Sequence, residues 1–207
     1  MDVPAGSPAE LSRVKQADIA CSVDDWEKLY SDLHRYPNLT CLEFVGLEAP
    51  SIPEEVRFPD QISDWQWYAC DRIGTIRNPQ FYRSVKMVMV TGSPADLPEF
   101  LRDLKQAPAL ESLTLNGLGG GKLPDEIFEL KQLRILDLGN NDLTAIPETL
   151  SSLENLEYVY LHDNQLRKLP GALKRLPRLK YVLHADNPIV LSDEDRKFIR
   201  SLAARRQ

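Results

Sequence analysis

Hydrophobic and polar positions repeat along the second half of the chain with a period of 23 residues. One copy of the pattern holds Leu133, Leu136, Leu138, Asn141, Leu143, Ile146, Pro147, Leu150 and Leu153. The next copy holds Leu156, Val159, Leu161, Asn164, Leu166, Leu169, Pro170, Leu173 and Leu176, and a third begins with Leu179, Val182, Asn187 and Ile189. A fixed period of this length predicts a solenoid, in which stacked repeats bury a shared row of apolar side chains.

The motif inside each copy, L-x-x-L-x-L-x-x-N-x-L with a following L-P or I-P pair, resembles the leucine-rich-repeat family. The resemblance implies an α/β fold, a right-handed curved solenoid of about seven repeats with a parallel sheet on its concave side. After each strand the chain is expected to return on the convex side as extended or 3-10 segments. The L-P pair and the N-P-I sequence before the last helix are similar to those of bacterial family members.

The period extends back towards the N-terminus and gives repeat starts at 39, 62, 85, 110, 133, 156 and 179. In this register Trp65 and Trp67 are core residues. The asparagine position of the repeat reads Leu47, Cys70, Ser93, Leu118, Asn141, Asn164 and Asn187. In the family this amide bonds to backbone groups of neighbouring turns. We therefore expect an asparagine ladder in the last three repeats, less regular loops before them, and a structural role for Cys70.

Capping signals flank the repeats. Ser22 with Asp25 predicts a helix that Pro37 ends, and Ser192 with Asp195 predicts a final helix. Because an ordinary terminal repeat would leave an apolar face in water, both helices are expected to cap the stack. The predicted organisation is a disordered leader at 1–12, an N-terminal cap with a helix at 13–38, leucine-rich repeats at 39–191 and a C-terminal cap helix at 192–207.

Charge changes this picture in the first half of the chain. The 207 residues are 43% hydrophobic, which predicts one folded unit, and carry a formal net charge of -6. Residues 1–109 hold 11 Lys and Arg against 17 Asp and Glu, so the net charge lies in that half. An acidic chain argues against nucleic acid or an anionic membrane as the main partner. It leaves open an inhibitor or immunity-type protein whose acidic first half blocks a basic partner.

Cysteine usage and the N-terminus bear on location. Cys21, Cys41 and Cys70 are too few for a disulfide framework and indicate a reducing compartment. The N-terminus lacks the apolar segment of a signal peptide, and no run reaches the roughly 18 apolar residues of a membrane span. The prediction is a cytoplasmic protein or one delivered into a host cell.

The concave sheet is the expected site of function. Strand side chains alternate, so residues two, four and six positions after each start point onto the concave face. Exposed aromatic clusters are typical of interface cores, although such rings can also simply cover the sheet by cross-strand packing. The predicted partner-binding residues are Tyr158, Tyr160, Tyr181, Ile135, Asp137, His162 and Leu183, with Met87 and Met89 as a second apolar pair two strands away.

A polar edge lies beside the tyrosines, seven residues after each start, at Asn140, Asp163 and Asp186. This edge would either select a basic partner segment or face water. The resemblance implies a non-enzymatic protein-interaction module, acting as a bacterial effector or an intracellular adaptor. A monomer is expected, with a homodimer left open.

The sequence offers no catalytic, cofactor or metal site. The glycine-rich segment 117–122 lacks the residues that a phosphate loop needs at both ends, and a loop insertion explains it better. Cys41 lies five strands from His162 in this register, too far for a nucleophile and its base. His184 falls at a core position. The basic run that begins at Arg167 is assigned to a solvated convex side.

Overall fold

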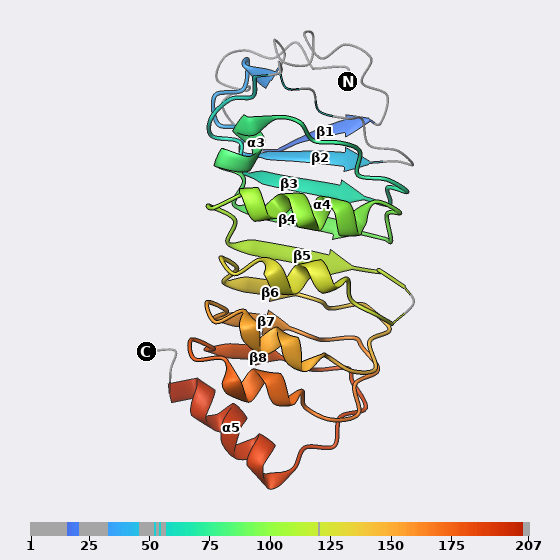
Figure 1. Cartoon of the computed structure of the whole chain (residues 1–207), viewed down its shortest axis with the longest axis vertical. Coiled ribbons are helices and arrows are strands. Elements are labelled where there is room, and N and C mark those ends of the chain that lie inside the picture. Colours follow the sequence, from blue (N-terminus) through green and yellow to red (C-terminus); the bar gives the residue numbers. More distant parts are fainter. Residues whose placement is uncertain are drawn as a thin grey trace. The chain divides into compact units, whose positions relative to one another are not determined.

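The computed structural model describes residues 33–45, 52, 54, 57–119 and 121–204, and the backbone alone of 16–20 (Figure 1). The chain divides into two compact units, Met1–Leu110 and Glu111–Gln207, where the composition predicts one. The leader predicted at 1–12 and residues 22–32 of the predicted N-terminal cap helix lie outside the described residues.

The first unit contains parallel strands in chain order. Its described strands are β1 (Gln16–Ala20), β2 (Cys41–Val45), β3 (Asp64–Tyr68) and β4 (Met87–Thr91). Cys41 pairs with Asp64 and Asp64 with Met87, which confirms the repeat starts at 39, 62 and 85. β1 pairs in parallel with β2 and adds a strand inside the segment that the capping signals assign to the N-terminal cap.

The first unit returns partly through α-helices: α3 (Pro79–Ser84) and α4 (Leu97–Asp103), which continues into the 3-10 turn η1 (Leu104–Gln106). The expectation of extended or 3-10 returns is therefore wrong here. Asn78 starts α3 because its side-chain oxygen accepts hydrogen bonds from the backbone N–H groups of Gln80 (3.0 Å) and Phe81 (3.2 Å). Proline in the first turn of each helix favours the same start, since it has no N–H to satisfy.

Aromatic rings fill the core between these helices and the strands of the first unit. Trp65 and Trp67 are 0% and 1% exposed, which confirms their assignment to the core. Phe44 stacks on Trp67 with 5.4 Å between ring centroids, and Phe81 meets Trp65 edge-on at 4.9 Å. Rings of this size bury a large apolar area each, so they stabilise a unit whose leucines are fewer.

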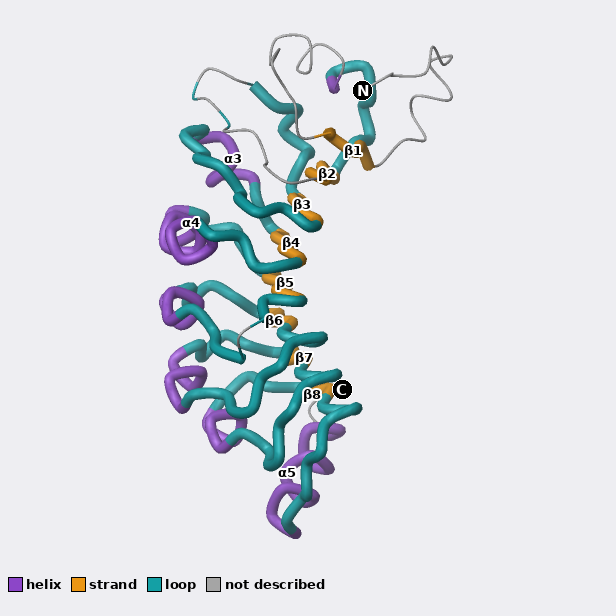
Figure 2. The backbone as a smooth tube through the Cα atoms, turned by 90° about the vertical axis from the view of Figure 1, so that its right-hand side faces the viewer, coloured by secondary structure: helices purple, strands orange, loops and turns teal. Residues whose placement is uncertain are grey.

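The second unit has the regular form of the repeat. Its strands are β5 (Ser112–Asn116), β6 (Ile135–Asp137), β7 (Tyr158–Tyr160) and β8 (Tyr181–Leu183). The predicted 3-10 returns are confirmed here as η2 (Asp125–Glu129), η3 (Glu148–Ser152) and η4 (Gly171–Arg175). Figure 2 shows these segments on the side opposite to the strands. The pairing of the strands confirms the starts at 110, 133, 156 and 179.

The predicted asparagine ladder is present in the second unit. Asn164 is 1% exposed, and its Nδ2 group donates to the carbonyl oxygen of Leu138 (2.9 Å) while its Oδ1 accepts from the N–H of Leu143 (3.0 Å). Asn141 and Asn187 make the same pair of contacts one repeat earlier and one repeat later. The ladder therefore satisfies backbone groups that the turns leave unpaired.

The first unit satisfies its turns with other residues. The Cys70 thiol donates to the carbonyl of Phe44 (3.6 Å), 26 residues earlier, as Asn164 does to Leu138. Cys70 is 3% exposed, so its expected structural role is confirmed. The carboxylate of Asp96 accepts from the N–H groups of Ile73 (2.8 Å) and Gly74 (3.1 Å) in the preceding turn.

Left-handed backbone geometry occurs seven residues after the repeat starts. The φ angles of Asn140, Asp163 and Asp186 are 53°, 52° and 55°. Asparagine and aspartate tolerate this region better than most residues, because their short polar side chains bond locally. Backbone conformation thus accounts for the residue types of the predicted polar edge, and the side chains there are exposed.

The final helix α5 (Asp193–Ala203) begins at the predicted capping box. The Ser192 hydroxyl accepts from the N–H of Asp195 (3.1 Å), and the Asp195 carboxylate accepts from the N–H of Ser192 (3.0 Å). Lys174 of η4 lies 2.7 Å from the same carboxylate. The Lys174 ammonium and the Ser192 hydroxyl lower the pKa of Asp195 to about 2. This ion pair ties α5 to the last 3-10 segment.

Candidate functional site

The strands β6, β7 and β8 bring most of the predicted site residues together. Their register forms two rows across the strands: Ile135, Tyr158 and Tyr181, then Asp137, Tyr160 and Leu183. All six side chains are half-buried. Neighbouring strands lie about 4.8 Å apart, so the six form one contiguous surface, which we call the tyrosine face.

Tyr160 is central to the tyrosine face. Its ring meets that of Tyr181 at a centroid distance of 5.8 Å and an interplanar angle of 64°, an edge-to-face arrangement. Burial raises the pKa of the Tyr160 hydroxyl, and Tyr181, Asp137 and Tyr158 raise it further. The phenol therefore stays neutral and can both donate and accept a hydrogen bond.

His162 borders the tyrosine face and lies against Gly139, in the turn that follows the preceding strand β6. A Cβ atom added to Gly139 would come within 2.2 Å of the His162 ring, so only glycine leaves room for the imidazole. The His162 Nε2 atom is 3.4 Å from the Nδ2 atom of Asn140. Asp137 fixes the same turn, since its Oδ1 accepts from the N–H of Gly139 (2.8 Å). The edge of the face is thus held in place by local contacts.

An ion-pair ladder, which the repeat motif alone does not reveal, runs along the beginning of these strands. Arg134 lies 3.1 Å from Glu111 and 3.0 Å from Glu157, and Lys180 lies 2.7 Å from Glu157. Hydrogen bonds from Arg134 and then Lys180 lower the pKa of Glu157. The four residues recur every 23 positions with alternating sign, which is the signal that reveals them in the sequence. The basic groups nearest the tyrosine face are therefore already paired with acids.

Met87 and Met89 belong to the first unit, so the structure assigns the predicted site residues to two separate sets. Both side chains are half-buried on β4. The Tyr68 hydroxyl donates to the sulfur of Met89 at 3.3 Å. This contact gives Met89 a packing role within the sheet of the first unit.

Two groups considered for catalysis, Cys41 and His184, belong to different units of the chain. Cys41 is 7% exposed, and its sulfur accepts from the Gln66 amide at 3.1 Å. His184 is half-buried, so its assignment to the core is wrong: it belongs to the last repeat, and no described strand follows β8 in the sheet to cover it. Among the described residues, no group of His, Cys, Asp or Glu is arranged to hold a metal ion. No described helix has the length and apolar character needed to cross a membrane.

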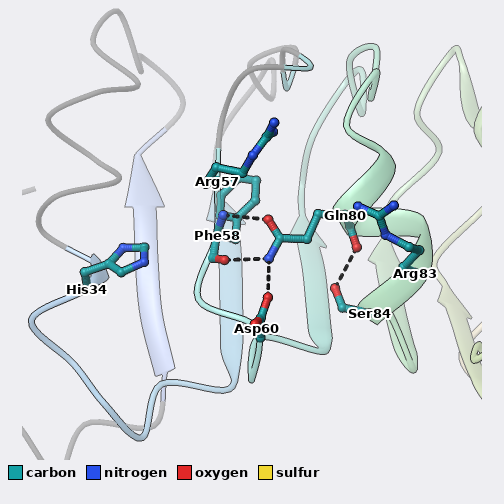
Figure 3. A pocket seen from close by; sticks show the side chains of 7 residues that line it. All are labelled: His34, Arg57, Phe58, Asp60, Gln80, Arg83 and Ser84. Carbon is teal, nitrogen blue, oxygen red and sulfur yellow. Dashed lines mark hydrogen bonds between the residues drawn. The ribbon is translucent and has the colours of Figure 1, made fainter.

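A pocket of about 680 Å³ opens on the first unit and was not expected from the sequence (Figure 3). Gln80 closes one wall, because its amide pairs with both backbone groups of Phe58 (3.0 and 2.6 Å) and donates to Asp60 (2.8 Å). The Ser84 hydroxyl donates to the carbonyl of Gln80 at 3.0 Å within α3. Arg83 is exposed at its border. The Ser84 hydroxyl and the Gln80 amide are therefore both engaged in hydrogen bonds within the first unit.

The fold has known relatives. Residues 108–166 match the family model described as leucine rich repeat. A comparison of the sequence with curated proteins found no match. A Leptospira interrogans leucine-rich-repeat protein of known structure is 24% identical with a TM-score of 0.51, over 84% of this chain and 49% of that one.

Two further solved structures share the fold. Human 5T4, also called Wnt-activated inhibitory factor 1 or trophoblast glycoprotein, is 19% identical with a TM-score of 0.55, over 77% of this chain and 65% of that one. TLR13, solved in complex with ssRNA13, is 16% identical with a TM-score of 0.54, over 89% of this chain and 31% of that one. This chain thus spans less than two thirds of each of the three proteins.

Proposed function

Because the chain is a leucine-rich-repeat protein, we propose that it is a non-enzymatic interaction module that binds a protein partner on the tyrosine face. One observation carries the proposal: Tyr158, Tyr160 and Tyr181 lie half-buried on adjacent strands, with apolar side chains beside them. The sparse cysteines and the type of repeat support an intracellular adaptor or a bacterial effector.

The physical character of the tyrosine face supports binding. Tyrosine offers a large apolar ring and a polar hydroxyl, and it loses little conformational entropy when a partner covers it. The edge-to-face contact of Tyr160 with Tyr181 already restricts both rings, so part of the ordering cost is met before binding. Truncating a central tyrosine of this kind costs about 2 kcal/mol of binding free energy in known interfaces.

A capture experiment tests the proposal. The intact protein and the variant Tyr158→Ala/Tyr160→Ala/Tyr181→Ala are used as baits in host and bacterial lysates. Thr149→Ala/Glu154→Ala is the matched control, because both side chains are exposed in or next to η3, outside the strands. Circular dichroism establishes that each variant is folded.

The proposal expects a specific protein that both the intact chain and the control retain and the tyrosine variant loses. A set of bound proteins that is indifferent to the tyrosines would contradict the tyrosine face and direct attention to the acidic first half. If the rings serve only cross-strand packing, the tyrosine variant would lose stability without losing any partner. Size-exclusion chromatography separates a foreign partner from self-association, since loss of a dimer peak would make the face a homodimer surface.

A further inference from the structure

We propose that the partner presents a cationic segment, with arginine or lysine side chains that lie on the tyrosine rings and reach the aspartates at the strand ends. This inference rests on the proposed function and names the chemistry of its partner. It concerns the second unit alone.

Charge is segregated within the second unit. The strands and the turns that follow them, residues 112–119, 135–142, 158–165 and 181–188, contain no lysine or arginine. They contain four aspartates: Asp137, Asp142, Asp163 and Asp186. The basic residues of the unit lie elsewhere, and Arg134, Lys174 and Lys180 are paired with acids. A unit with as many basic as acidic residues thus presents an acidic and aromatic surface on one side.

The centre of the tyrosine face suits a flat cation. Asp137 pairs with Tyr160 across β6 and β7, so an acidic and an aromatic side chain leave the same face of neighbouring strands, whose backbones lie about 4.8 Å apart. A guanidinium within about 6 Å of the ring centroid is attracted to the ring face, and the neighbouring carboxylate adds a charge of opposite sign. Ile135 and Leu183 flank the rings and would cover the apolar stem of the same side chain.

The edge of the face adds a second set of charges. Asp163 and Asp186 are exposed and occupy equivalent left-handed positions in consecutive repeats. A backbone hydrogen bond from the N–H of Asp163 to the carbonyl of Ala185 (3.1 Å) fixes one turn against the next. No ion pair involves either carboxylate within the described part of the second unit. A segment that crosses the strands therefore meets two carboxylates, spaced at about one strand separation.

The same charges disfavour a nucleic acid on this face. Phosphate groups need lysine or arginine to replace their counterions, and the strand segments provide none. Aromatic rings alone stack bases, but single-strand binding sites combine such rings with a basic groove. An RNA ligand is therefore an outcome that the test must be able to detect.

Defined peptides test the inference without knowledge of the natural partner. The probe is a fluorescent peptide in which arginine alternates with glycine, and its control replaces each arginine by citrulline, which keeps the planar group and removes the charge. Fluorescence anisotropy measures both on the whole chain at low and at physiological ionic strength. We expect the citrulline peptide to bind about tenfold more weakly, and the arginine peptide to weaken as salt rises.

Variants locate the binding. Asp163→Asn/Asp186→Asn should weaken the arginine peptide about tenfold, and asparagine keeps the left-handed backbone of both positions. Tyr160→Ala should weaken it by a similar factor. Asp125→Asn/Glu154→Gln removes the same charge from exposed positions outside the strands and should change the affinity by less than about twofold.

Two results would overturn the inference. The first is an arginine peptide that binds no better than its citrulline control or is indifferent to Asp163→Asn/Asp186→Asn. The second is a single-stranded oligouridylate that binds the face in its place and is lost with Tyr160→Ala. In the first case, a captured protein that still depends on the tyrosines would leave the proposed function intact while excluding a cationic segment.

Discussion

Asn164→Ala should lower the free energy of unfolding of the second unit by about 3 kcal/mol, a figure that follows from its hydrogen bonds. The Asn164 amide donates to the carbonyls of Leu138 (2.9 Å), Leu161 (3.1 Å) and His162 (3.0 Å). Each carbonyl keeps another donor, from Asn141, Asn187 and the Asn140 backbone respectively, so each loss costs only about 0.5 kcal/mol.

Loss of the hydrogen bond from the N–H of Leu143 makes the largest contribution to the fall in the free energy of unfolding. This hydrogen bond to Asn164 Oδ1 is 3.0 Å long in a buried turn, and alanine offers no acceptor in its place. A buried donor left without a partner costs about 1–3 kcal/mol. Together with the three weaker losses, this gives the value above.

Urea denaturation followed by far-ultraviolet circular dichroism measures this effect. Tryptophan emission reports on the first unit and serves as an internal reference for the second, because Trp26, Trp65 and Trp67 all belong to the first unit. Asn155→Ala is the matched control, since Asn155 makes one exposed hydrogen bond, to the carbonyl of Lys131 at 2.8 Å. The control should cost less than about 1 kcal/mol. If Asn164→Ala costs no more than Asn155→Ala, the view of the ladder as a structural device is wrong.

Two further changes test the turns and the end of the stack. The pKa of Asp195 is about 2 in the folded protein against an ordinary 3.8, so its ionised form stabilises the fold. This contribution, on the order of 1 kcal/mol, is present above about pH 5 and is lost as the pH falls towards 2. Thermal unfolding of Asp195→Asn should lack that pH dependence. Gly139→Ala should lower the free energy of unfolding by about 1–2 kcal/mol, because the added methyl group collides with the His162 ring. In a double-mutant cycle, His162→Ala should recover most of this loss, and additive losses would contradict the contact.

The repeat register was predictable because one physical constraint acts at every turn. Leu136, Val159 and Val182 must enter the same core, and they are 0%, 0% and 8% exposed. The asparagine ladder follows from the same spacing, since each amide bonds to turns one repeat away. The grouping of the tyrosines on one face then follows from strand alternation alone.

Other features depended on signals that the repeat motif does not contain. The sequence of β1, QADIA, holds one large apolar residue, Ile19, which is a weak strand signal, and the capping signals nearby compete with it. The helix α3 begins at the cap formed by Asn78, where the repeat motif predicts an extended or 3-10 segment. The contact of His162 with Gly139 requires knowledge of a side-chain rotamer, which no spacing provides. In each of these places, local interactions that the repeat period does not specify determine the structure.

Site-specific photo-crosslinking tests the central claim most directly. Benzoylphenylalanine replaces Tyr160 in one variant and Glu154, at an exposed turn outside the strands, in another. Each variant is irradiated in the lysate that yields a captured partner, and the products are resolved by mass. A partner that crosslinks from position 160 and not from position 154 is the predicted result. A partner that crosslinks from position 154 alone, or from neither position, would contradict binding on the tyrosine face.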